Sequence, residues 1–133
     1  MYITGTSKQD ITPSSKNVGM MGYGMWFNKV KDVETPLYAR AFVIEHEPTK
    51  KKLAYVCAEF AFITIAIKQE VVKRLQKMHA ECNYNETNVF LSAQHTHSGP
   101  GGYSHYALYN MSVPGFVPEV FETFSAGIVK AIV

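Results

Sequence analysis

The chain has 133 residues, of which 47% are hydrophobic and 18% charged, and this composition is typical of one globular domain. Its formal net charge of +2 is too small to indicate a nucleic-acid-binding protein. No stretch is apolar enough for a membrane span, and the first residues lack the basic start and apolar core of a signal peptide. Cys57 and Cys82 make no disulfide pattern. Because the chain ends inside an apolar run, we expect it to be a piece of a longer domain.

The predicted elements alternate between strands and helices. A short strand and turn are expected within residues 2–12, and the runs 37–47 and 53–60 have strand composition. Neither of these two runs alternates cleanly, so both are predicted to be central strands covered on two faces. Apolar residues recur at helical spacing from residue 65 to 81. The predicted order continues with a strand at 88–93, a long loop to Gly115 and a helix at 118–133.

This succession predicts an α/β fold: a layered sheet with flanking helices. A loop rich in glycine and methionine precedes the second strand, at residues 18–27. Glycine lets the backbone pass close to a ligand or to another segment. The loop is therefore expected either to border a pocket or to be buried with methionine as a filler.

The segment 94–102, which follows the last predicted strand, is the most informative stretch. Period-two alternation would place His95 and His97 on the same side of the chain, just past the strand end. Neutral imidazole is a good zinc ligand, so the pair predicts either a metal or substrate site or a hydrogen-bonded pair that anchors the loop. Catalytic zinc usually has three protein ligands. The chain offers no convincing third, so the remaining ligands are expected beyond Val133.

Three further features of the sequence bear on this site. Glu59 ends the second core strand and is expected either to orient an imidazole or to form a cap or salt bridge. Ser98 lacks the sequence context of a nucleophile elbow, although residues 98–102 have the composition of an anion-binding cradle. The loop that follows is aromatic and apolar, around Tyr103 and Tyr106. It is expected to form either a pocket mouth for a lipid-like substrate or part of the core.

The chain resembles the neutral/alkaline ceramidase family over nearly its whole length. The most specific match is His-Thr-His-Ser-Gly-Pro-Gly-Gly after the apolar run 88–93. Other matching stretches are Asp10-Ile11-Thr12, Gly19-Met20-Met21-Gly22-Tyr23, Ala39 to Ile44, Tyr103 to Val113, Gly115-Phe116 and Gly127 to Lys130. The resemblance implies that residues 1–133 are the N-terminal portion of a zinc hydrolase catalytic domain, without the rest of that domain and the C-terminal immunoglobulin-like domain.

The resemblance also implies an activity: zinc-dependent cleavage of the amide of ceramide to sphingosine and a fatty acid. It implies that His95 ligates zinc and that His97 is catalytic, while the other ligands, a His, a Glu and a Tyr, lie further along in the family. The family has Asp where Glu59 stands and usually Thr where Gln94 stands. Glu59 is expected to support the metal ligand from behind. The residues expected to contact substrate are Gly22, Tyr23, Ser98, Gly99, Tyr103 and Tyr106.

The expected partners are a ceramide-like lipid and, peripherally, a membrane surface, with no nucleic acid. Family members are mostly secreted, periplasmic or at the cell surface. The alternatives are a related zinc hydrolase with another amide or ester substrate, and a non-catalytic lipid- or anion-binding module built on the glycine-rich loop. By itself the 133-residue chain is expected to be inactive, because its site would be incomplete.

Overall fold

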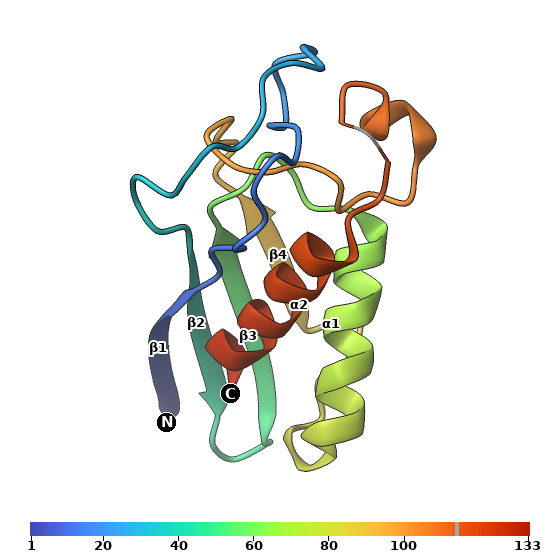
Figure 1. The fold of residues 1–133 in the computed structure, drawn as a ribbon. Coiled ribbons are helices and arrows are strands. Elements are labelled where there is room, and N and C mark those ends of the chain that lie inside the picture. Colours follow the sequence, from blue (N-terminus) through green and yellow to red (C-terminus); the bar gives the residue numbers. More distant parts are fainter. Residues whose placement is uncertain (114) are drawn as a thin grey trace.

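A four-stranded sheet with two helices on one face forms the structure, a computed structural model that describes residues 1–113 and 115–133 (Figure 1). The sheet order is β1-β2-β3-β4. The strands are β1 (Tyr2–Asp10), β2 (Tyr38–His46), β3 (Lys51–Ala58) and β4 (Val89–Ala93). The helices are α1 (Ile65–Met78) and α2 (Pro118–Ile132), with short 3-10 turns η1 (Ala80–Cys82) and η2 (Ala107–Asn110). The predicted α/β fold class is therefore confirmed.

The pairing of neighbouring strands changes from antiparallel to parallel between β3 and β4. β1, β2 and β3 pair antiparallel, and the connections between them need no crossover. β4 then pairs parallel with β3, from Ala54 opposite Val89 to Ala58 opposite Ala93. A parallel neighbour requires a crossover connection, which α1 supplies. As a result β3 and β4 end at the same edge, so the segments that follow them lie side by side.

Helix α1 begins where its sequence offers a cap. The Thr64 hydroxyl accepts a hydrogen bond from the Ile67 N–H (3.1 Å), which satisfies one of the free donors of the first turn. The helix ends at Met78, three residues before the predicted end at Glu81. The chain continues there as η1, and Asn83 closes this turn in the left-handed region at φ 54°.

The core lies between the sheet and the two helices. Small alanines line the covered face of the central strands, which lets the helices approach the sheet closely. Aromatic rings fill the space under the edge where β3 ends, and the rings of Phe60 and Phe124 stack with centroids 4.7 Å apart. Arg74 of α1 also bridges to Glu122 of α2 through two hydrogen bonds of 2.7 and 2.6 Å. The two helices are thus joined by packing and by charge.

The other face of the sheet is open in the part of the chain that the structure describes. Phe42, Tyr55 and Phe90 lie opposite one another on β2, β3 and β4, and each is at least 40% exposed. The prediction that β2 and β3 are covered on both faces is therefore wrong for the described residues. Apolar side chains on two faces break the alternation of both strands, but α1 and α2 cover only one face (Figure 1).

Gly127 is expected to be required where α2 crosses the start of the chain. An alanine in mid-helix would normally stabilise by roughly 1 kcal/mol over glycine. At Gly127, however, an added Cβ would lie 2.4 Å from Cγ2 of the buried Ile11. We expect Gly127→Ala to lower the free energy of unfolding by about 1 kcal/mol or more, measured by urea denaturation, because overpacking a core costs roughly 1–3 kcal/mol. Lys130→Ala, on an exposed position of α2, is the control and is expected to change it by less than about 0.5 kcal/mol. A stabilising Gly127→Ala would show that α2 and the segment around Ile11 can move apart at little cost in free energy.

Candidate functional site

The histidine segment leaves the sheet through a left-handed turn. Backbone pairing with the end of β3 and the residues after it continues past the end of β4. The Gln94 N–H donates to the Ala58 carbonyl (2.9 Å) and the His95 N–H to the Phe60 carbonyl (3.2 Å). His95 then adopts φ 67°, a region that residues other than glycine seldom occupy. Such a conformation persists only when the surroundings impose it, and it occurs preferentially at functional sites.

The imidazole of His95 is fixed by one hydrogen bond. Its Nδ1 lies 2.6 Å from the carbonyl oxygen of Ala61, which follows β3. A carbonyl only accepts, so Nδ1 must carry the proton. In the neutral ring the lone pair is then on Nε2, the atom that faces away from the backbone. This arrangement, in which one ring nitrogen bonds to the backbone and the other is left as a ligand, is the usual one for a metal-binding histidine.

His97 lies against His95. The two Nε2 atoms are 3.2 Å apart and the ring centroids 5.0 Å. The expectation that the two imidazoles share one side is confirmed, but the cause differs from the predicted one. β4 ends at Ala93, and the rings meet because the chain turns at His95 rather than because strand alternation continues. With the lone pair on His95 Nε2, His97 is the donor of the hydrogen bond between them.

The glycine-methionine loop forms the surface on which the His97 ring rests. Gly22 has φ 97°, and an added Cβ there would lie 2.7 Å from the His97 ring. The Tyr23 ring meets the same imidazole edge-on, with centroids 5.7 Å apart. The loop is attached to the histidine segment by the Met21 N–H, which donates to the Gly99 carbonyl (3.1 Å). The loop thus borders the site, as one of the two sequence interpretations had it, while Met21 is buried, as the other had it.

The tyrosines of the long loop occupy different environments. Tyr103 has no exposed surface, packs on Phe60 and Phe124, and accepts a hydrogen bond from the Phe62 N–H (3.3 Å) through its hydroxyl. Burial raises the pKa of Tyr103 to about 12. For Tyr103 this corrects the expectation of a substrate contact: the side chain is part of the core and supports the loop from beneath. Tyr106 is half exposed and remains available for such a contact.

Glu59 is engaged with the sheet. Its carboxylate accepts from the Tyr38 N–H (2.8 Å) and pairs with the guanidinium of Arg40 (2.5 Å). Among the described residues neither imidazole hydrogen bonds to it. These contacts match the cap and salt-bridge alternative, while a role in orienting a metal ligand stays a prediction.

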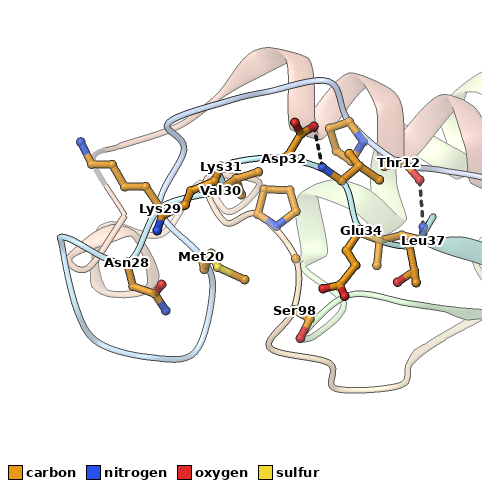
Figure 2. A pocket seen from close by; sticks show the side chains of 15 residues that line it. Thr12, Met20, Asn28, Lys29, Val30, Lys31, Asp32, Glu34, Leu37 and Ser98 are labelled. Atoms are coloured by element: carbon orange, nitrogen blue, oxygen red, sulfur yellow. Dashed lines mark hydrogen bonds between the residues drawn. The ribbon is translucent and has the colours of Figure 1, made fainter.

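A cavity of about 440 Å³ lies beside the histidine segment, as Figure 2 shows. Ser98, Gly99 and Pro100 form part of its wall, and residues 28–35 form much of the rest. Its lining includes two lysines and two acidic side chains: Lys29, Lys31, Asp32 and Glu34. Neither His95 nor His97 lines it. Of the predicted residues, Ser98 and Gly99 therefore face this cavity, whereas Gly22 and Tyr23 lie at the imidazole pair.

Among the described residues, the donors at the imidazole pair are too few to hold a metal ion by themselves. Within residues 1–113 and 115–133 there is no group of three His, Cys, Asp or Glu side chains placed to hold a metal ion. The lone pair on His95 Nε2, which here accepts from His97, is a donor that suits zinc, which takes nitrogen ligands and needs at least two more from protein. The chemistry of this donor fits zinc, and the number of donors does not complete a site.

The fold and the site together define a class: an α/β domain that presents an oriented imidazole pair at the edge where two parallel strands end. The chain matches the family model described as neutral/alkaline non-lysosomal ceramidase, N-terminal, over residues 2–133. It belongs to this family, and the resemblance seen in the sequence is confirmed.

Individual relatives agree with this assignment. The chain is 44% identical over 131 residues to the neutral ceramidase of Pseudomonas aeruginosa, covering 98% of this chain and 19% of that protein. It is 36% identical to neutral ceramidase of Drosophila melanogaster and 37% identical to neutral ceramidase 3 of Arabidopsis thaliana, covering 98% and 99% of this chain and 18% of each relative. The chain thus spans about a fifth of the length of these relatives.

Solved structures show the same fold. The crystal structure of the Pseudomonas aeruginosa neutral ceramidase matches with a TM-score of 0.94 at 44% identity, over 98% of this chain and 21% of that one. A structure of a ceramidase complexed with C2 matches with the same TM-score and identity, over 98% of this chain and 20% of that one.

Gly22 is expected to hold the position of the His97 ring. Gly22→Ala should displace this ring, because the new Cβ would overlap it, and the NMR signals of the His97 ring in ¹³C-histidine-labelled protein should shift. The signals of His46, His79 and His105 should stay in place. Gly24→Ala is the matched control, since Gly24 also has positive φ (65°) but an added Cβ would meet nothing within 4 Å. Equal shifts of the His97 signals in both variants would show that backbone strain, and not the contact, is responsible.

Proposed function

We propose that the chain supplies part of the active site of a zinc-dependent enzyme that hydrolyses the amide bond of ceramide to sphingosine and a fatty acid. The single observation that carries the proposal is the hydrogen bond from His95 Nδ1 to the Ala61 carbonyl, which leaves Nε2 as a ligand. Support comes from relatives named neutral ceramidase, each of which matches nearly the whole chain.

His95 would hold zinc through Nε2, and the remaining ligands would come from residues outside this chain. Zinc bound there supplies a Lewis acid that polarises the amide carbonyl and lowers the pKa of water. The left-handed backbone at His95 and the carbonyl of Ala61 fix the direction of the ring before any ion arrives. Preorganisation of this kind removes the cost of ordering the ligand when the metal binds.

His97 would act on the substrate. Its Nε2 lies 3.2 Å from that of His95, and its ring lies against Gly22 and Tyr23. Once His95 Nε2 is occupied, the proton on His97 Nε2 is free to be donated to another acceptor. The oxygen of the scissile amide gains negative charge as the carbonyl is attacked, and a fixed donor beside it stabilises that charge.

The substrate would be bound by the residues around the imidazole pair. Gly22 leaves the backbone accessible, and Tyr23 and Tyr106 offer partly exposed rings for an apolar chain. Ser98 and Gly99 line the neighbouring cavity, which is large enough for part of a lipid. A related hydrolase with another amide or ester substrate is the second candidate, because exposed Gln94 borders the site where the family usually has Thr.

A chimera tests this proposal. The chain would replace the 131 matching residues of the Pseudomonas aeruginosa neutral ceramidase, and hydrolysis of a fluorescent ceramide and zinc content would be measured together. We expect an active, zinc-loaded chimera and an inactive isolated chain. His95→Ala should lose zinc and activity together. His97→Ala should keep zinc and lose activity by roughly 10²–10³, as removal of a fixed oxyanion donor does.

Each outcome decides a different point. His46→Ala is the control, because His46 lies at the far end of β2, bonded to Thr49 (2.8 Å), and both readouts should stay unchanged. A His95→Ala chimera that retains zinc and activity would refute the ligand assignment. A chimera that holds zinc and leaves ceramide intact while cleaving another amide would favour the second candidate.

A further inference from the structure

Two loops carry large apolar side chains into solvent. The first contributes Met25, Trp26 and Phe27, and the second, around η2, contributes Tyr106, Leu108, Tyr109 and Met111. These seven residues are called the apolar rim below. Trp26 and Leu108 are each 73% exposed and Met111 79%. A soluble protein seldom exposes such a group of side chains without a partner.

The two loops stand at one end of the molecule. Their bases are joined by the bridge between Met20 and Pro100 and by the Gly101 N–H, which donates to the Gly19 carbonyl (2.8 Å). Gly19 also lies directly against the backbone of Val113, where an added Cβ would meet Val113 Cα at 3.2 Å. Figure 1 shows both loops beyond the edge at which β3 and β4 end. The histidine segment leaves the sheet at this same edge, so the rim and the imidazole pair share one end.

The chemistry of the rim is that of a membrane interface. Tryptophan and tyrosine combine an apolar ring with a polar atom, and this makes them the residues that gather at the boundary between lipid and water. Methionine and leucine at loop tips can enter the acyl region without a shaped pocket. Lys29 and Lys31 follow the first loop directly but are balanced by Asp32 and Glu34, so the attraction to lipid rests on the apolar side chains and not on net charge. The open sheet face, with Phe42, Tyr55 and Phe90 in register, is instead the kind of surface that another protein layer covers.

We infer that the apolar rim docks the protein on a phospholipid membrane and brings the imidazole pair to the level of the headgroups. This inference rests on the proposed function in one respect: a ceramide-like substrate resides in membranes. No helix among the described residues is both long and apolar enough to cross a membrane. Docking through the rim is a peripheral contact, made by side chains that enter the interface from two loops.

Trp26 makes the inference directly measurable, because it is the only tryptophan of the chain. The purified chain would be titrated with phosphatidylcholine vesicles, with and without a minor fraction of phosphatidylglycerol, while tryptophan emission is recorded. We expect a blue shift on binding, since the indole leaves water. Phosphatidylcholine brominated on its acyl chains should quench the emission, and this shows that Trp26 itself enters the membrane.

The variant Leu108→Asp/Met111→Asp tests the second loop while leaving Trp26 in place. Both side chains are well exposed, so the fold should persist, which circular dichroism checks. We expect the vesicle partition coefficient to fall roughly tenfold or more, because two inserted apolar groups are replaced by charges that the interface and anionic headgroups disfavour. Met78→Asp is the matched control: Met78 is 56% exposed, but it lies at the opposite end of α1 and should leave binding unchanged.

Three results would overturn the inference. Unchanged emission on addition of vesicles would mean that the apolar rim does not enter a phospholipid membrane. Binding without quenching by brominated lipid would mean that another surface, such as the open sheet face, contacts the membrane. Equal loss in Met78→Asp and in the double variant would mean that binding is not localised. None of these measurements needs zinc or activity, so failure of the ceramide chimera and failure of membrane docking are separate results.

Discussion

The parallel pairing of β3 with β4 is the constraint on which the site depends. It makes two segments that are more than thirty positions apart in the chain end at one edge, so that backbone carbonyls after β3 face the residues after β4. Three hydrogen bonds use this adjacency: Gln94 with Ala58, His95 with Phe60, and the His95 ring with Ala61. The ring is therefore positioned by the sheet itself. Helix α1 and its Thr64 cap matter to the site because they make the crossover that produces the parallel pair.

The position of the imidazole pair depends on a second constraint, which is that glycines leave room beside the histidine segment. Gly22 allows a backbone segment from a distant loop to lie under the His97 ring, and Gly101 leaves room for Met21 of the same loop beside the histidine segment. Contacts made by backbone atoms vary little in position, which keeps the His97 imidazole in a fixed orientation. Tyr103 completes this support from inside the molecule, because its hydroxyl and ring tie the long loop to Phe60, Phe62 and Phe124.

The sequence was sufficient to predict the strands, the helices and the position of the histidine segment at a strand end. The prediction that His95 and His97 share one side was also correct, although strand alternation is not the reason for it. The sequence could not predict the turn at His95, since a left-handed conformation in histidine is imposed by tertiary contacts and leaves no local pattern. Nor could it show that Tyr103 is buried and Tyr106 exposed, because both lie in the same aromatic and apolar loop and differ only in their tertiary contacts. The contact of Gly22 with His97 joins residues from two loops and carries no spacing signal.

The two exposed apolar regions of the molecule call for different partners. The open sheet face has rings in register across three strands, so a second layer of secondary structure can cover it with side chains that interdigitate. The apolar side chains of this face are the reason why β2 and β3 do not alternate, although α1 and α2 cover only the other face. The apolar rim has no such regularity: its side chains extend from two irregular loops, which suits the fluid partner inferred above. Because the histidine segment lies at the same end as the rim and leaves the sheet from its edge, covering the open face would leave the rim and the imidazole pair accessible together. A lipid drawn from a membrane would then reach the imidazole pair without crossing the molecule.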